Sequence, residues 1–277
     1  MTTVGELWAS TTEVIGDRNH ARWLVETAVS VDSIDEAVAE PVTDRMVAHL
    51  DRMVARYRGG EPLQYVLGHW AFRHLELAVD PRVLIPRSET EEVTGVALTI
   101  ARRVHPRRVL ELGTGSGAIG LSMAYELPIE GTEVWITDID PDALDVARAN
   151  LAGIGRAARN VRIAAGSWFD ALDTSLRFDV IVSNPPYIAD GDLEVATDVL
   201  EHEPHRALFS GSDGLDAIRE IVSGAPARLR SGGSLVLEIG YRQGATVRSL
   251  LLAAGFSGAE IIPDAAGLDR IAVASVP

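Results

Sequence analysis

Short apolar runs alternate with helical stretches from about Thr90 to the end of the chain. The apolar runs read "RRVLEL", "EVWITD", "VRIAA", "FDVIVS", "SLVLEI" and "RIAVAS", and segments with helical spacing such as "PDALDVARANLAGIG" separate most of them. Strands joined through helices pair in parallel, because each helix carries the chain back to the same end of the sheet. The pattern therefore predicts an α/β domain whose mainly parallel sheet is covered by helices on both faces.

The preceding segment is predicted to be helical. Apolar residues recur at helical spacing in "TDRMVAHLDRMVARYR", where Thr43 is a suitable N-cap and Gly59-Gly60 ends the helix. The stretch "GHWAFRHLELAVD" then alternates apolar and polar residues, which is typical of a β-hairpin. We expect a small N-terminal helical bundle over residues 1–66, a linking β-hairpin over 67–85, and the α/β domain over 86–277.

Composition excludes several kinds of chemistry. The 277 residues carry a net charge of −15, contain no cysteine, and include arginine but no lysine. Thiolate catalysis, cysteine-bound metals and lysine Schiff bases are therefore excluded, and the acidic balance disfavours a phosphate backbone as partner. Because no apolar run approaches the length of a membrane span, we expect a cytoplasmic protein that contacts no membrane.

A glycine-rich turn follows the first apolar run of the α/β region. Gly113, Gly115 and Gly117 alternate in "ELGTGSGAIG", where a strand is predicted to pass into a helix. Glycine at such a turn lets a ligand approach the backbone closely. Asp138 ends the second apolar run, where a carboxylate can accept hydrogen bonds from both ribose hydroxyls of an adenosine-containing cofactor.

The glycine spacing alone leaves the cofactor open. Gly113-x-Gly115-x-x-Ala118 also satisfies the dinucleotide fingerprint, and an ordinary tight turn is a third interpretation. Glu111 favours S-adenosylmethionine over a nicotinamide dinucleotide. A carboxylate just before the loop can hold the loop's N–H groups or face a sulfonium, whereas it is poorly placed beside a pyrophosphate.

The fourth apolar run ends in Asn184-Pro185-Pro186-Tyr187. Proline donates no backbone N–H and cannot continue a strand ladder, so the backbone here is stiff. In a doubly wound sheet whose order reverses beside its first strand, the first and fourth strands are neighbours. Their loops then face each other across the ligand crevice.

This tetrapeptide can hold a planar –NH2 group next to a methyl donor. The Asn184 side-chain oxygen and the Pro185 carbonyl can accept its two hydrogens, and Tyr187 can stack on the plane that carries it. Because the lone pair of such a nitrogen is delocalised, placement and fixed dipoles must supply much of the rate. We therefore predict that Asn184, Pro185 and Tyr187 are catalytic and that they bind the substrate together with Pro186.

Several motifs resemble those of the HemK/PrmC family, the N5-glutamine methyltransferases of peptide-chain release factors. They are "VLELGTGSGAIG", "TDIDPDAL", "SNPPYI", "HEPHRALFSGSDGLD" and "LEIG", with "GEPLQYVLGHWAF" and "LIPRSETE" upstream. The resemblance covers most of the chain and is weak only over the N-terminal helices. Glycine loops and "NPPY" also occur in other methyltransferases, but this combination is specific to the family.

The resemblance implies a class I S-adenosylmethionine-dependent methyltransferase with a Rossmann-like, mainly parallel seven-stranded sheet, a reversed last strand and a helical N-terminal domain that recognises the substrate. The implied substrate is the glutamine side-chain amide in the Gly-Gly-Gln motif of class-1 release factors. The residues that correspond to the family's cofactor site are Arg87, Thr90, Glu111, Gly113, Thr114, Gly115, Ser116, Gly117, Asp138, Ile139, Trp168 and Asn184. In this correspondence the glycine loop cradles the methionine part, Asp138 holds the ribose and Trp168 borders the adenine.

Some residue roles stay open within the resemblance. Trp168 also fits a core aromatic, and Arg87 also fits a surface ion pair. Ser167 stands where the family commonly has aspartate, so we expect a weaker hydrogen bond to the adenine amino group. Ser88 replaces the usual proline, with little expected consequence.

Two further interpretations compete with release factor methylation. A nucleic-acid amine methyltransferase would use the same motif on a flipped adenine, but it would need a basic groove. A non-catalytic S-adenosylmethionine-binding scaffold would have no need of Asn184 and Tyr187. We expect class-1 release factors as the protein substrate, no direct contact with nucleic acid, no metal, and a monomeric chain.

Overall fold

The structure is a computed structural model that describes residues 2–194 and 196–277. The chain divides into two compact units, one formed by Met1–His69 with Thr197–His202 and the other by Trp70–Ala196 with Glu203–Pro277. The domain boundaries expected from the sequence stay a prediction. Among the described residues, no helix combines the length and the apolar character that crossing a membrane requires.

The first unit is helical. Its helices are α1 (Val4–Ile15), α2 (Arg18–Val29), α3 (Ile34–Ala37), α4 (Asp44–Arg58), α5 (Leu63–Leu67) and α9 (Thr197–His202). The predicted cap of α4 is confirmed, because the Thr43 hydroxyl accepts the N–H of Met46 at 3.3 Å, and Gly59 caps the other end. Leu24 of α2 and Leu50 of α4 are buried in one apolar cluster that holds this unit together.

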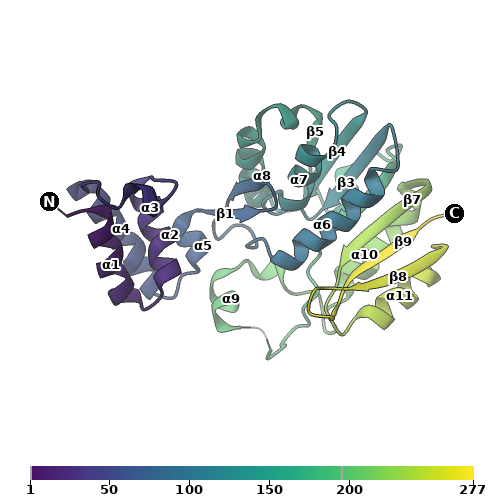
Figure 1. The fold of residues 1–277 in the computed structure, drawn as a ribbon. Helices are drawn as coiled ribbons and strands as arrows, with labels where there is room; N and C mark the ends of the chain where they lie inside the picture. The colour runs from purple at the N-terminus through teal and green to yellow at the C-terminus, as the bar shows by residue number, and fades with distance from the viewer. Residues whose placement is uncertain (1, 195) are drawn as a thin grey trace. The chain divides into compact units, whose positions relative to one another are not determined.

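The second unit contains the predicted seven-stranded sheet and, before it, the predicted hairpin (Figure 1). The hairpin pairs β1 (His69–Phe72) with β2 (Leu75–Ala78). The sheet strands are β3 (Arg107–Leu112), β4 (Thr132–Asp138), β5 (Val161–Ala165), β6 (Phe178–Ser183), β7 (Leu229–Glu238), β8 (Gly258–Pro263) and β9 (Asp269–Ser275). Their order is β5-β4-β3-β6-β7-β9-β8, and only the pairs that involve β9 are antiparallel.

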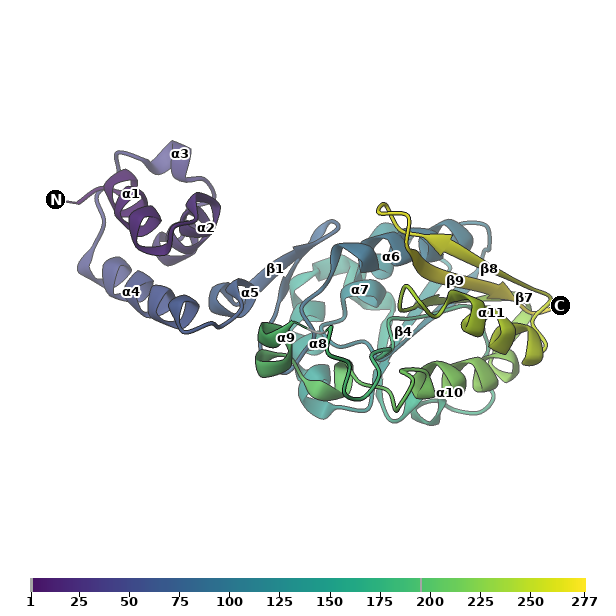
Figure 2. The same cartoon turned by 90° about the horizontal axis from the view of Figure 1, so that it is seen from below.

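Helices cover both faces of this sheet (Figure 2). They are α6 (Ser88–Ala101), α7 (Ala118–Glu126), α8 (Pro141–Gly153), α10 (Asp216–Gly224) and α11 (Gly244–Ala253), with short 3₁₀ turns η1 (Gly155–Asn160), η2 (Trp168–Ala171), η3 (His205–Ala207) and η4 (Ala225–Ala227). Val180 and Val182 of β6 pack in the cluster with α6, α7 and α8, whereas Ile181 packs with α10 and α11. Successive residues thus alternate between two cores, as the predicted two-sided sheet requires.

Two details differ from what the residue pattern alone predicts. The pattern did not identify β8, an edge strand whose residues are exposed or half-buried, so it lacks a strongly apolar run. The stretch 189–212, predicted to be irregular, contains α9 and η3, and a parallel bridge joins Ile188 to Phe209. Helices of so few residues carry too little periodicity to be predicted.

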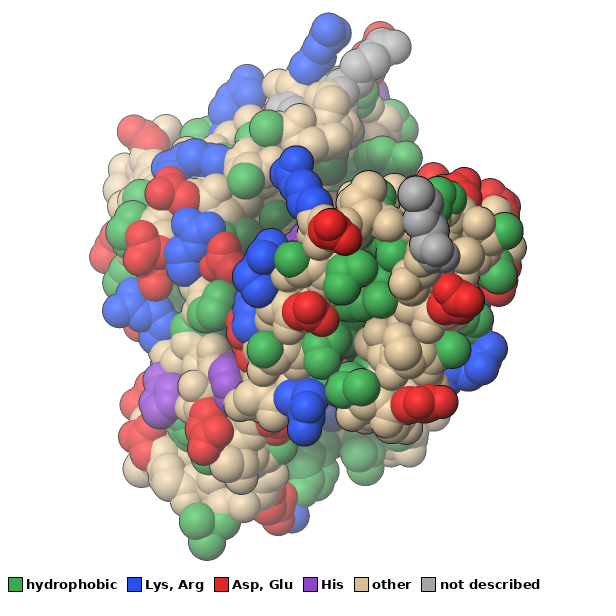
Figure 3. All heavy atoms as spheres, turned by 90° about the vertical axis from the view of Figure 1, so that its left-hand side faces the viewer, with side chains coloured by type: hydrophobic (Ala, Val, Ile, Leu, Met, Phe, Trp, Pro, Cys, Tyr) green, Lys and Arg blue, Asp and Glu red, His purple; other side chains and the backbone are tan. Residues whose placement is uncertain are grey.

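Figure 3 shows one face of the molecule, where acidic and basic side chains lie among apolar ones. The whole chain carries a net charge of −15. Mixed charge of this kind differs from the concentrated basic surface that attracts a phosphate backbone.

The order of the strands positions the ligand site. β3 and β6 pair in parallel with Val109 beside Val180 and Leu112 beside Ser183. The loops that follow the two strands therefore leave the sheet at the same edge, as predicted for the first and fourth strands. This edge carries Gly113 at one strand end and Asn184 at the other.

Packing between α7 and the sheet leaves no room for a side chain at Gly120. A Cβ there would lie 2.6 Å from Glu111 Oε2 and closer still to Ile136. We expect Gly120→Ala to lower the free energy of unfolding by about 1–3 kcal/mol, in the range of other overpacked cores. Gly95→Ala in α6 is the matched control, because a Cβ there meets only Arg73 at 3.6 Å.

The control should raise stability by about 0.5–1 kcal/mol, since alanine loses less entropy than glycine on entering a helix. Urea unfolding of both variants measures the difference. A Gly120→Ala protein as stable as Gly95→Ala would show that the packing at Glu111 is loose.

Candidate active site

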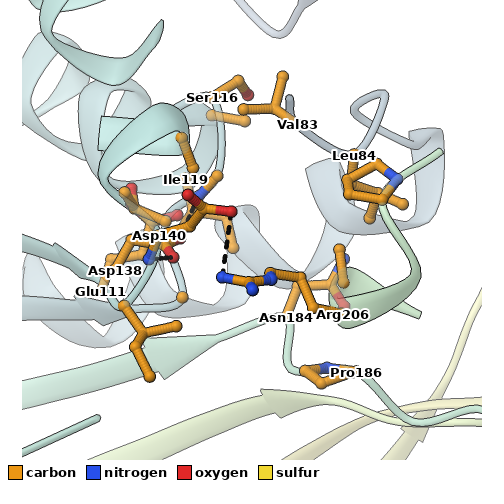
Figure 4. Close-up of a pocket in the computed structure, with 18 of the residues that line it drawn as sticks. Val83, Leu84, Glu111, Ser116, Ile119, Asp138, Asp140, Asn184, Pro186 and Arg206 are labelled. Carbon is orange, nitrogen blue, oxygen red and sulfur yellow. Dashed lines mark hydrogen bonds and ion pairs between the residues drawn. The ribbon is translucent and has the colours of Figure 1, made fainter. Parts of the chain in front are cut away.

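A cavity of about 380 Å³ opens at the carboxyl ends of the central strands, within the size range of small-molecule sites (Figure 4). Side chains or backbone from several segments line it. These are Arg82, Val83, Leu84, Pro86, Arg87, Thr90, Glu111, Gly113–Ser116, Ala118, Ile119, Asp138–Asp140, Ala143, Gly166–Trp168, Asn184, Pro186, Pro204, Arg206 and Ala207.

The glycine loop forms one side of the cavity. Gly113 and Gly115 have φ values of 66° and 54°, in the left-handed region that side chains rarely adopt. A Cβ on Gly113 would meet the Trp168 ring at 3.4 Å, whereas no atom lies within 4 Å of one on Gly115. The loop thus combines a turn that requires glycine with open space in which a ligand can reach the backbone.

Glu111 forms a hydrogen bond with this loop. Its carboxylate, in a side chain that is only 2% exposed, accepts the N–H of Gly120 at 2.9 Å and the hydroxyl proton of Thr114. Burial raises the pKa of Glu111 to about 8, although both hydrogen bonds oppose that rise. The structure thus ties Glu111 to the loop through the Thr114 hydroxyl, whereas the N–H that it accepts belongs to Gly120 of α7, and Glu111 also lines the cavity.

Asp138 lies opposite the loop at the end of β4. Its two carboxylate oxygens accept the N–H groups of Gly115 and Asp140, both at 2.9 Å. Burial raises its pKa, and these backbone hydrogen bonds oppose the rise. Each carboxylate oxygen has a second lone pair, so Asp138 can still accept hydrogen bonds from a ligand.

Asn184 is the first of several side chains that are linked in series by hydrogen bonds. Its Nδ2 donates to Thr90 Oγ1 at 3.1 Å, and that hydroxyl donates to Glu238 Oε2 at 2.7 Å. The Tyr187 hydroxyl donates to Glu238 Oε1 at 3.1 Å. Burial raises the pKa of the Tyr187 hydroxyl, with the charge of Glu238 as the second cause. Glu238 thus joins two residues that the sequence nominated for the site.

The opposite wall comes from segments 82–87 and 204–207. The carboxylate of Glu203, 4% exposed as a residue, accepts the N–H of Ile85 at 3.1 Å and pairs with Arg87, which ties the two segments together. Arg206 reaches across to Asp140 at 3.2 Å, the ion pair drawn in Figure 4. Arg87 therefore forms an ion pair and also lines the cavity, so both of its predicted roles remain compatible with its position.

Most residues nominated for cofactor binding meet at this cavity. Arg87, Thr90, Glu111, Gly113, Thr114, Gly115, Ser116, Asp138, Ile139, Trp168 and Asn184 line it, as does Pro186 of the predicted substrate group. Gly117, Pro185 and Tyr187 do not line it. Gly117 instead caps α7 with a φ of 89°. Trp168 both lines the cavity and packs on the core beside α10, so the two interpretations of this ring do not exclude each other.

Sequence reasoning missed Arg206, Asp140 and the role of Glu238. Glu238 had a detectable signal, because it ends an apolar strand with a carboxylate in the same way as Asp138. Arg206 lies in the motif "HEPHRALFSGSDGLD", but the motif does not indicate its ion-pair partner, which belongs to a distant segment. Within residues 2–194 and 196–277, no cluster of three or more histidine, aspartate or glutamate side chains could hold a metal ion.

Comparison with known proteins identifies similar sequences over nearly the whole chain. Residues 94–212 match the methyltransferase small domain. The release factor glutamine methyltransferase of Neisseria gonorrhoeae (strain ATCC 700825 / FA 1090) is 46% identical over 233 residues, which cover 84% of this chain and 83% of that protein. The protein of the same name from Gloeobacter violaceus is 40% identical over 257 residues, covering 91% and 88%.

A solved structure shares the fold. The Thermus thermophilus 16S rRNA N2 G1207 methyltransferase, in complex with AdoMet and guanosine, superposes with a TM-score of 0.51 at 22% identity. The match covers 76% of this chain and 50% of that one. At this identity the likeness concerns the fold, which agrees with the predicted class I architecture.

The raised pKa of Glu111 predicts how stability depends on pH. Between its ordinary value of 4.5 and about 8, the folded chain keeps a proton that the unfolded chain releases. The contribution of this group to stability therefore falls as pH rises, by at most about 1.4 kcal/mol per pH unit. Glu111→Gln lacks the titration, so wild type should lose stability relative to this variant from about pH 5 to pH 8.

Urea unfolding over that pH range measures the difference between the two proteins. Glu130→Gln, at an exposed position, is the control and should follow wild type. Parallel stability curves for wild type and Glu111→Gln would contradict the assignment of a protonated, buried Glu111.

Proposed function

The chain belongs to the release factor glutamine methyltransferases, and from this premise we propose how its cavity works. The protein transfers a methyl group from S-adenosylmethionine to the side-chain amide nitrogen, N5, of the glutamine in the Gly-Gly-Gln motif of class-1 peptide-chain release factors. The observation that carries the proposal is the pairing of β3 with β6, which brings the glycine loop and Asn184 to one cavity.

The cofactor half of the cavity suits S-adenosylmethionine. Open space beside Gly115 admits a ligand to the backbone, and the Asp138 carboxylate is available to ribose hydroxyls. The apolar side chains of Ile119 and Ile139 and the Trp168 ring suit an adenine. When bound, the cofactor supplies an electrophilic methyl group on a positively charged sulfur.

In this proposal the Glu111 carboxylate faces that positive charge. It lines the cavity beside the glycine loop and is almost fully buried. A nearby cation favours the ionised form of a carboxylate, so cofactor binding should lower the pKa of Glu111. In this proposal Glu111 holds the loop through Thr114 and Gly120 and also attracts the cationic ligand.

The substrate half depends on Asn184 and Pro185. Their side-chain and backbone oxygens accept the two hydrogens of the glutamine –NH2 group. This grip aims a nitrogen whose lone pair is delocalised into the carbonyl, and it stabilises the positive charge that develops as the new bond forms. The proton can leave after transfer, so no general base with a tuned pKa is needed.

Tyr187 is proposed to stack on the plane of the glutamine amide. Its hydroxyl is held by Glu238 and its carbonyl accepts Gln243 Nε2 at 2.9 Å. The first contact restrains the half-buried ring, and the second restrains the backbone that carries it. Because Tyr187 does not line the cofactor cavity, the proposed stacking takes place outside that cavity.

We propose further that the N-terminal helical unit contacts the body of the release factor, since the tip loop that carries the glutamine offers little contact area. We also propose that the enzyme acts as a monomer and without direct contact with nucleic acid.

A methyl-transfer assay with labelled S-adenosylmethionine tests the function. Purified unmodified release factor, a peptide of its Gly-Gly-Gln loop, and genomic DNA are offered separately. We expect one methyl group on the motif glutamine by peptide mass mapping, with a lower kcat/KM for the peptide than for the whole factor. Label on DNA alone would contradict the proposed substrate, and equal kcat/KM values would contradict a role for contacts outside the loop.

Asn184→Ala should separate binding from transfer. The variant loses the oxygen that grips the amide hydrogens, chiefly as charge develops, while the cofactor keeps the glycine loop and Asp138. We expect kcat to fall by roughly 10²–10³-fold, as when one preorganised dipole is removed from other sites. Equilibrium dialysis should find the affinity for S-adenosylmethionine within about threefold of wild type. A near wild-type kcat would show that Asn184 does not hold the reacting nitrogen.

A further inference from the structure

We propose that Glu238 is a positioning residue that acts through Thr90 to determine which end of the Asn184 amide faces the substrate. The inference rests on the proposed function, in which the Asn184 oxygen accepts a hydrogen of the glutamine amide. It concerns a residue that touches neither ligand, since Glu238 does not line the cavity.

Three elements bring these groups together. Glu238 is the last residue of β7, Thr90 lies in the first turn of α6, and Asn184 directly follows β6. The hydrogen bonds measure 2.7 Å from the Thr90 hydroxyl to Glu238 and 3.1 Å from Asn184 Nδ2 to Thr90. Glu238 and Thr90 are 1% and 4% exposed, so water cannot readily replace these contacts.

The direction of each hydrogen bond follows from the number of protons. Burial raises the pKa of Glu238, whereas the hydroxyls of Thr90 and Tyr187 and the charge of Arg270 lower it, and in this proposal the group is ionised. An ionised carboxylate only accepts, so the single hydroxyl proton of Thr90 must then point to Glu238. Thr90 Oγ1 can then only accept a proton from Asn184, which must turn its –NH2 group toward Thr90. The Asn184 oxygen is thereby left for the cavity, where it can accept.

The opposite orientation would block the reaction. If Thr90 were free to donate, the Asn184 oxygen could turn toward it and the –NH2 group would face the substrate. Two –NH2 groups present only hydrogens to each other, so the glutamine amide would lose its partner. The Glu238 carboxylate therefore sets the direction of the whole chain of hydrogen bonds.

The same carboxylate restrains Tyr187. The Tyr187 hydroxyl donates to Glu238 Oε1 at 3.1 Å, so the two oxygens of one carboxylate serve the two side chains that flank the proline pair. Burial raises the pKa of Glu238, so keeping it ionised costs free energy. The positive charge of Arg270 in β9 lowers this pKa, whereas the negative charge of Glu89 in α6 raises it.

This cost distinguishes positioning from simple support of the fold. Burial disfavours the charged form of Glu238, and Arg270 keeps its ion pair with Asp264 at 3.2 Å when Glu238 is neutralised. Glu238→Gln should therefore unfold at the same temperature as wild type or higher, while its kcat falls about tenfold or more. A residue that merely holds the fold would lose melting temperature and activity together.

The test is a double-mutant cycle on the full chain with whole release factor as substrate. Glu238→Gln and Thr90→Val should each lower kcat by about tenfold or more, and Glu238→Gln, which does not line the cavity, should keep the KM for S-adenosylmethionine within about threefold of wild type. Because both act through Asn184, the double variant should lose little more than the worse single variant. Thr90→Ser keeps a hydroxyl and should recover most of the kcat that Thr90→Val loses.

We call the chain of hydrogen bonds from Glu238 through Thr90 to Asn184 the relay. Each of three results would overturn it: losses of kcat that multiply in the double variant, single variants with wild-type kcat, or no recovery of kcat with Thr90→Ser. A measurement without turnover separates it from the proposed function. In ¹⁵N NMR spectra, the side-chain –NH2 protons of Asn184 should exchange slowly with water in wild type and faster in Thr90→Val. Equal exchange overturns the relay, whereas slow wild-type exchange in a protein that methylates no release factor supports the relay and refutes the proposed function.

Discussion

The parallel pairing of β3 with β6 is the contact on which the site depends. With Leu112 beside Ser183, both strands end at the same level, and the residues that follow them enter one cavity. Alternating apolar residues hold this register, because a slip by one position would move Val180 and Ile181 into the wrong cores. The packing that stabilises the sheet therefore also sets the distance between the glycine loop and Asn184.

Two buried carboxylates and one half-buried one stand at or next to the ends of three strands around this cavity. Glu111 accepts the Thr114 hydroxyl of the glycine loop, and Asp138 accepts the N–H of Gly115. Glu238 accepts the hydroxyls of Thr90 and Tyr187. Burial raises the pKa of each, so each reduces stability at neutral pH compared with an exposed carboxylate. The polar groups that are bonded to these carboxylates each have a preferred hydrogen-bond partner, which limits their rotation.

Much of the fold follows from local pattern. Six strands, their connecting helices and the cap at Thr43 were predicted because apolar periodicity and capping residues act over a few neighbours. β8 was not predicted, because a half-exposed edge strand needs fewer apolar residues and so shows no clear apolar pattern. Arg206 was missed because it joins the site through an ion pair with Asp140, which lies 66 positions earlier in the chain.

The sequence by itself determined the family and the cofactor class and nominated the residues of the site, since glycines, carboxylates and the Asn-Pro-Pro-Tyr turn act through their own local geometry. Only the tertiary structure decided that Tyr187 lies outside the cofactor cavity and that Glu238 is linked to Asn184 by hydrogen bonds through Thr90. Thr90 and Glu238 are separated by 148 positions. A hydrogen bond between them depends on a distance that exists only after the sheet and α6 have packed together.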